Sequence, residues 1–151
     1  MRHNKTNPSI NYLKNIEYYK QMHKKGINMS NGKRKNSKDS YNGKTTSLYA
    51  DIIKNIIEQN NYRTLLEYGC GKAFYYENQF ILKNKKINSL KDYWEIEVKL
   101  YDPCYEKFSI LTTKKSDITI CIDVLEHIPK EDIHWILEEF FKLTKSMVFM
   151  N

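Results

Sequence analysis

The chain has 151 residues, of which 40% are apolar and 28% are charged, and its formal net charge is +7. This size and composition are typical of a single soluble globular domain and exclude a fibrous or disordered chain. No apolar run reaches the ~18 residues that a membrane span needs, and residues 1–5 are polar, unlike a signal peptide. We therefore expect a cytoplasmic protein that makes no membrane contact.

The positive charge is concentrated near the N-terminus. Residues 1–45 hold 11 Lys and Arg against 2 Asp and Glu, whereas residues 46–151 hold 14 against 16. Such a basic segment is a candidate for binding nucleic acid. A second interpretation is that the Lys- and Asn-rich composition reflects an AT-rich coding genome.

Three cysteines, Cys70, Cys104 and Cys121, are an odd number at wide spacings. This pattern fits neither a disulfide framework nor a zinc ribbon. Cys70 and Cys121 are therefore interpreted as small packing residues.

Apolar residues recur at helical spacing in some segments, while short apolar runs in others indicate strands. The predicted helices are residues 8–25, 46–60 (capped by Thr46 or Ser47), about 72–82 and 130–143. The predicted strands are residues 63–68, 97–102, 117–123 and 146–150. Polar residues 26–40 predict a loop or linker, and residues 83–95 predict a connection or partial helix.

Alternating strands and helices predict an α/β fold with a mostly parallel sheet and helices on both faces. We expect two parts, a basic helix with a flexible segment at residues 1–45 and the sheet domain at residues 46–151. Ligands of such sheets bind at the carboxyl ends of the strands. Glu67, Asp102 and Asp123 all lie near those ends, so they are candidate ligand-binding residues.

A glycine turn follows the first strand of this domain, with Gly69 and Gly71 placed directly after Glu67. Glycines allow a ligand to approach the backbone closely, and the start of a helix offers free N–H groups. The acid at this turn would repel a phosphate and suits a ligand that carries a cation or hydroxyl groups.

Two nucleotide-binding motifs are excluded. Position 74 is Phe rather than the third glycine of a dinucleotide-binding motif. Residues 43–45, Gly-Lys-Thr, resemble the end of a P-loop, but position 38 is Lys where that motif needs glycine, and no strand precedes it.

Three motifs in order resemble the class I S-adenosylmethionine-dependent methyltransferases. They are Glu67-x-Gly69-x-Gly71-x-Ala73 after a strand, Asp102 at the end of the next strand, and Asp-Val-Leu-Glu-His-Ile-Pro at residues 123–129 after a third. The resemblance covers residues 46–151 and implies a Rossmann-like sheet and S-adenosyl-L-methionine as cofactor.

By this resemblance Glu67 faces the methionine portion of the cofactor and Asp102 accepts hydrogen bonds from its ribose hydroxyls. The remaining residues that the resemblance assigns to the cofactor are Gly69, Cys70, Gly71, Pro103 and Asp123. His127 is the candidate base, with Glu126 beside it, because methyl transfer often needs a base to remove a proton. The alternative for His127 is a packing role at the start of a helix.

The chain departs from the family at three places. Ala73 replaces the third glycine, and the strand that usually supplies an adenine-contacting acid is short or missing. Only Thr112, Thr113 and Ser116 are polar groups available there. The family's sheet has seven strands, and this chain ends at about the fifth, which leaves an exposed edge strand for a possible homo-oligomer.

Asp123-x-x-Glu126-His127 is also similar to the metal site of the small-RNA 3′-terminal 2′-O-methyltransferases. Its first acid is Asp, however, His134 lies one residue short of two helical turns beyond His127, and no histidine follows His134, so we expect no metal. The leading hypothesis is a methyltransferase that acts on a small molecule or an unidentified acceptor. The alternatives are a nucleic-acid methyltransferase of the RNA 2′-O type and a non-catalytic S-adenosylmethionine-binding or assembly module.

Overall fold

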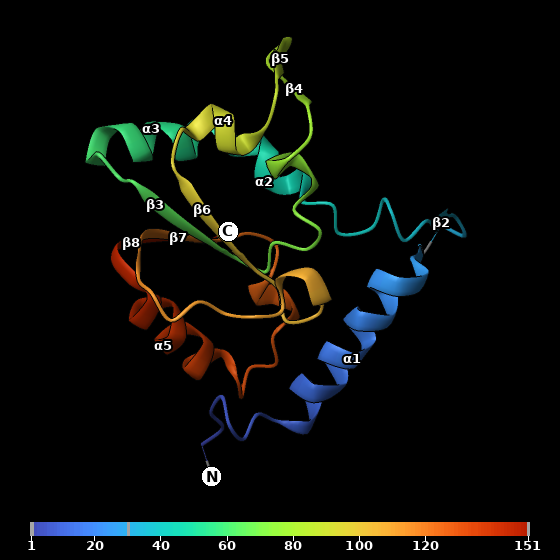
Figure 1. Ribbon diagram of the computed structural model, residues 1–151. Helices are drawn as coiled ribbons and strands as arrows, with labels where there is room; N and C mark the ends of the chain where they lie inside the picture. The colour runs from blue at the N-terminus through green and yellow to red at the C-terminus, as the bar shows by residue number, and fades with distance from the viewer. Residues whose placement is uncertain (1, 30, 151) are drawn as a thin grey trace.

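A four-stranded parallel sheet forms the centre of the computed structural model, which describes residues 2–29 and 31–150 (Figure 1). Its strands lie in the order β6-β3-β7-β8, with every neighbouring pair parallel. The strands are β3 (Thr64–Tyr68), β6 (Glu97–Tyr101), β7 (Ser116–Cys121) and β8 (Thr144–Met150). The predicted α/β fold with a parallel sheet is confirmed, although this sheet has four strands rather than about five.

Helices cover both faces of the sheet, as predicted. Helices α3 (Ala50–Asn60) and α4 (Leu90–Trp94) pack on one face, and α5 (Ile133–Leu143) packs on the other. Successive residues of a strand point to opposite faces, so Leu65 joins the core beneath α3 while Leu66 joins the core beneath α5. The buried strand β3 therefore contributes apolar side chains to both cores.

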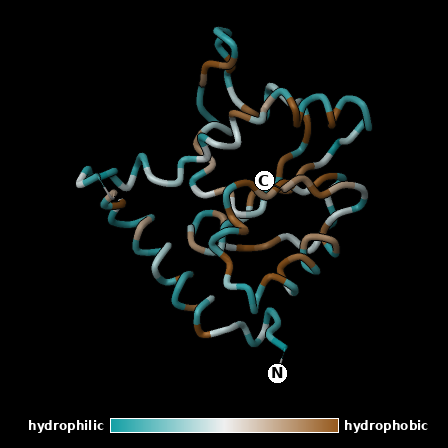
Figure 2. Tube along the Cα trace, turned by 180° about the vertical axis from the view of Figure 1, so that it is seen from behind, coloured by the Kyte–Doolittle hydropathy of each residue, from teal (hydrophilic) through white to brown (hydrophobic). Residues whose placement is uncertain are grey.

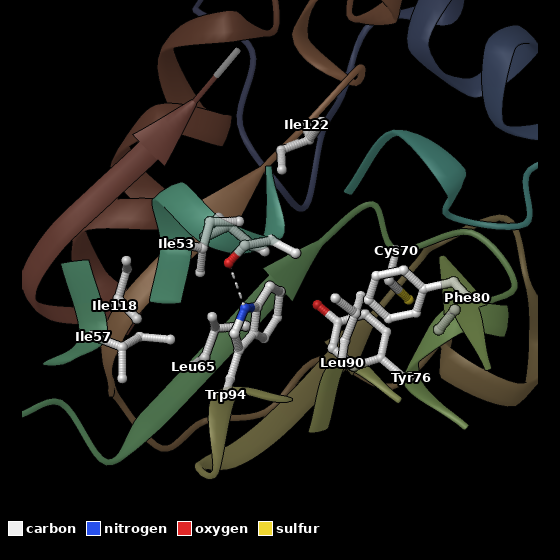
Figure 3. Packing of buried hydrophobic residues seen from close by; sticks show 13 residues of the cluster. Ile53, Ile57, Leu65, Cys70, Tyr76, Phe80, Leu90, Trp94, Ile118 and Ile122 are labelled. Carbon is white, nitrogen blue, oxygen red and sulfur yellow. Dashed lines mark hydrogen bonds between the residues drawn. The ribbon is translucent and has the colours of Figure 1, made fainter. Parts of the chain in front are cut away.

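Figure 3 shows the core beneath α3 and α4, where Ile53 and Ile57 meet Leu65 and Ile118. Trp94 closes this core, and its indole Nε1 donates a 2.9 Å hydrogen bond to the carbonyl oxygen of Ala50. Each fully buried aliphatic side chain contributes about 1.5–3 kcal/mol. This packing holds the carboxyl ends of the strands in a fixed relation to one another.

The segment after the glycine turn differs from the prediction. The helix predicted at residues 72–82 is wrong, because Ala73 adopts a left-handed backbone with φ of 49° that a helix cannot continue. The chain instead forms a short 3₁₀ turn, η1 (Phe74–Tyr76), and an antiparallel hairpin of β4 (Phe80–Leu82) and β5 (Lys85–Ile87). Further 3₁₀ turns are η2 (Glu106–Phe108) and η3 (Leu125–His127).

The predicted N-terminal helix is confirmed as α1 (Ile10–Lys25), which Ser9 caps through a bond from the Tyr12 amide. The stretch expected to be a loop at residues 26–40 contains a short antiparallel ladder of β1 (Ile27–Asn28) and β2 (Arg34–Lys35). Figure 2 shows that most of α1 is hydrophilic, and His23 is the one residue of this helix that is buried.

A break divides the helix predicted at residues 46–60. Tyr49 separates helix α2 (Lys44–Leu48) from α3, and neither Thr46 nor Ser47 caps α3. The apolar residues at helical spacing in this segment are not all buried, since Leu48 and Ile52 are exposed. None of the helices in the described ranges is both long enough and apolar enough to cross a membrane.

Candidate functional site

A cavity of about 410 Å³ lies at the carboxyl ends of β3, β6 and β7. Eight of the nine residues predicted as site residues line it, and Glu126 is the exception. These eight are Glu67, Gly69, Cys70, Gly71, Asp102, Pro103, Asp123 and His127. Its volume falls within the range of small-ligand sites in proteins, ~300–1,000 Å³.

The glycine turn forms the floor of this cavity. The amides of Gly69 and Cys70 both donate to the carbonyl oxygen of Tyr101, at 2.7 and 3.1 Å, which fixes the turn to the end of β6. Gly69 has φ of 84°, and a Cβ at this position would lie 2.3 Å from a methyl group of Val124. Both conformation and space therefore require glycine here.

Asp102 connects the two strand ends. Its side chain accepts from the Gly71 amide at Oδ2 and from the Cys104 amide at Oδ1, both at 2.8 Å. Burial raises the pKa of Asp102, and these backbone hydrogen bonds oppose the rise. Because two carboxylate oxygens offer about four acceptor positions, Asp102 can still accept hydrogen bonds from a ligand's hydroxyl groups.

Glu67 lies at the base of the cavity and is only 2% exposed. Its Oε1 accepts a 2.5 Å hydrogen bond from the Thr46 hydroxyl, while Oε2 is buried without a hydrogen-bond partner among the described residues. Burial raises the pKa of Glu67 to about 7, and neighbouring hydroxyl groups oppose that rise. Near neutral pH both protonation states of Glu67 are therefore populated.

His127 lies at the rim of the cavity with 46% of its side chain exposed. Its Nε2 is 3.8 Å from Oε1 of Glu126, and its ring centroid is 5.4 Å from that of Tyr19. The His127 carbonyl accepts a 2.9 Å bond from Asn15 of α1. His127 therefore has access to both the cavity and solvent, whereas Glu126 does not line the cavity.

One wall of the cavity comes from the N-terminal third of the chain, which the sequence analysis did not connect to the site. Residues of α1 at helical spacing line it, namely Tyr12, Asn15, Ile16, Tyr19 and His23. The apolar spacing predicted the helix but a different face of it, because Ile10 and Leu13 share that spacing with Ile16 and Tyr19 and are exposed.

Residues 41–46 and Leu48 complete this wall, and the backbone oxygens of Tyr41 and Asn42 accept from the amides of Lys72 and Phe74. Residues from both predicted parts of the chain, 1–45 and 46–151, line the same cavity. The division into these two parts stays a prediction.

Other polar candidates contribute little to the cavity. Thr112, Thr113 and Ser116 do not line it. Cys70 and Cys121 are buried, as the predicted packing role requires, and burial raises the pKa of both thiols. Within residues 2–29 and 31–150, no three His, Cys, Asp or Glu side chains are grouped as a metal ion would need.

Comparisons with protein-family models, with curated proteins and with solved structures found no match. The site is therefore interpreted from its own geometry and from the motifs that converge on it.

Proposed function

We propose that this protein is an S-adenosylmethionine-dependent methyltransferase with a Rossmann-like fold, and that its methyl acceptor is a small molecule. The observation that carries the proposal is the bond between Gly71 and Asp102, which joins the glycine turn and the acid of the next strand in one cavity. The central position of β3 in the sheet supports it, because α/β sheets bind nucleotide-like ligands at the carboxyl ends of central strands.

Each predicted cofactor residue receives a role in this proposal. Asp102 would accept the ribose hydroxyls, and Glu67, at the base of the cavity, would face the methionine portion directly or through water. Gly69 and Gly71 leave room for the chain of the ligand, with Cys70 between them and with Pro103 and Asp123 at the sides. The bound cofactor would supply a methyl group on an activated sulfonium, so the protein must mainly align the acceptor.

His127 would act as the base. It lies at the cavity rim, where an acceptor would enter, and histidine is the side chain that most often serves as a general base in enzymes. Glu126, 3.8 Å away, would stabilise the imidazolium that forms. A small acceptor is favoured over a nucleic acid because α1 covers one side of the cavity. In addition, two basic residues that precede α1, Arg2 and Lys5, are paired with Glu138 and Glu139 rather than free to bind phosphates.

Calorimetric titration with S-adenosylmethionine and S-adenosylhomocysteine tests the proposal. We expect micromolar-range binding by the unmodified chain, roughly 8 kcal/mol of binding free energy. Asp102→Ala should lose about 1–3 kcal/mol of this through unmet hydrogen bonds. Glu106→Ala, which removes an exposed carboxylate four residues away, is the matched control and should bind normally. Absence of binding by the unmodified chain would overturn the proposed cofactor.

A further inference from the structure

One end of the cavity carries positive charge that the proposed cofactor roles do not use. His23 from the last turns of α1 and Lys35 from β2 line this end, and Lys72 lies beside them after the glycine turn. The Lys72 Nζ donates to the carbonyl oxygen of Ser40 at 2.7 Å and lies 3.2 Å from Nδ1 of His23. These three side chains are called the basic cluster below.

His23 is held as a fixed hydrogen-bond donor within the basic cluster. An ammonium group can only donate, so Nδ1 of His23 accepts from Lys72 and the ring proton lies on Nε2. Tyr105 stacks on the His23 ring at 5.1 Å between centroids, and the Tyr41 ring lies at 5.0 Å. Burial, together with the Lys72 charge, lowers the pKa of His23 to about 4, so the imidazole stays neutral near pH 7.

Lys35 forms no ion pair among the described residues, although it faces the cavity. Burial lowers the pKa of Lys72, and the positive charge of Lys35 also contributes to that decrease. The charge of Asp102 acts on Lys72 more strongly than that of Lys35, so the Lys72 charge is partly balanced. The ammonium group of Lys35, which lines the cavity without an ion pair among the described residues, is therefore the charge that favours a bound anion here.

Aromatic rings connect the basic cluster to the proposed base along the inner face of α1. The His127 ring contacts Tyr19, the Tyr19 ring lies 5.6 Å from that of Tyr41, and Tyr41 contacts His23. A small molecule lying on these rings would place one end beside His127 and the other beside His23. The cavity can therefore hold the methyl-accepting group beside His127 and a second group of the same molecule beside His23.

We infer that the methyl acceptor is a small anionic molecule whose carboxylate or phosphate group binds Lys35 and the Nε2–H of His23. This inference rests on the function proposed above and names the chemical class of its acceptor. The carboxylate of the cofactor is a poorer occupant, because the methionine portion that carries this carboxylate is assigned to Glu67. His23 instead stacks on Tyr105, three residues beyond the proposed ribose acid Asp102.

The inference is tested by titrating inorganic phosphate and succinate into the full chain, with and without saturating S-adenosylhomocysteine, at constant ionic strength held with chloride. The readouts are the NMR signals of the His23 ring and the heat of binding. We expect saturable shifts at His23 with at least one anion. Lys35→Gln should weaken binding about tenfold, as loss of a charge-assisted hydrogen bond does. Lys33→Gln, which removes an exposed lysine beside the same strand, is the matched control.

The controls separate this inference from the proposed function. Anion binding without S-adenosylhomocysteine binding would leave the anion site standing and overturn the methyltransferase. The inference itself is overturned if neither anion shifts His23, or if Lys35→Gln abolishes S-adenosylhomocysteine binding, since the basic cluster would then hold the cofactor. The inference is also overturned if a single-stranded oligonucleotide binds the protein and Lys33→Gln weakens this binding as much as Lys35→Gln does. His23→Gln alters a buried residue, so the exposed Lys35 carries the test.

Discussion

The amide of Gly71 donates a 2.8 Å hydrogen bond to Oδ2 of Asp102, which joins the turn after β3 to the end of the neighbouring strand β6. Asp102 also accepts from the Cys104 amide, so one carboxylate holds the backbone on both sides of the cavity floor. A residue proposed to bind a ligand therefore also shapes the site, and its substitution should affect stability as well as binding.

Asp102→Ala should lower the free energy of unfolding by about 2 kcal/mol, because two backbone amides lose their acceptor in a buried position. Urea unfolding followed by circular dichroism measures this loss. Glu106→Ala serves as the control and should change stability by less than about 0.5 kcal/mol. Equal stability of the two variants would show that the Asp102 hydrogen bonds contribute little.

Glu67 should make the protein less stable as the pH rises. Burial raises its pKa from 4.5 to about 7, so the folded state holds a proton that the unfolded state releases. The stabilisation is complete below about pH 4.5 and is lost as the pH rises through about 7. Glu67→Gln should remove this dependence and be more stable than the unmodified chain at pH 8, by on the order of 3 kcal/mol at most.

Urea unfolding of both proteins from pH 5 to pH 8 tests this expectation. His23, whose pKa is lowered to about 4, destabilises both proteins equally as the pH falls below about 6.5. Only the difference between the two pH profiles therefore reports on Glu67. Parallel profiles would mean that Glu67 is ionised in the folded state throughout this range.

Gly71→Ala should destabilise the protein more than Gly32→Ala. Both glycines have positive φ, 57° and 77°, so alanine adds strain of roughly 1–2 kcal/mol at either position. A Cβ at Gly71 would also lie 2.3 Å from the Tyr41 carbonyl oxygen, whereas nothing lies within 4 Å of one at Gly32. Thermal unfolding compares the two variants, and equal decreases in Tm would contradict a close contact between residues 41 and 71.

Asp132→Ala should loosen α1 from the sheet domain. Oδ1 of this buried side chain accepts from the Ser9 amide at 3.0 Å and from Nε1 of Trp135 at 2.8 Å, joining the start of α1 to α5. Hydrogen exchange should accelerate at the amides of α1 and stay slow in β3. Glu131→Ala removes an exposed contact to Asn11 and is the matched control. Unchanged exchange in α1 would show that other contacts hold the helix.

The sequence alone predicted the parts of the molecule that depend on local patterns. Short apolar runs predicted the four strands of the sheet, and helical spacing predicted α1, α3 and α5 within a few residues. The strand ends then identified Glu67, Asp102 and Asp123 as neighbours of one cavity, because parallel strands end at a common edge.

Only the tertiary structure decided which segments close that cavity. The helix predicted after Gly71 is interrupted by the left-handed Ala73, a conformation that the contacts of residues 41–43 with this turn help to hold. Glu67 is bonded to Thr46, which lies 21 positions earlier in the chain, and Lys72 is paired with His23, which lies 49 positions earlier. Such contacts leave no periodic trace in the sequence, so neither the raised pKa of Glu67 nor the basic cluster could be read from it.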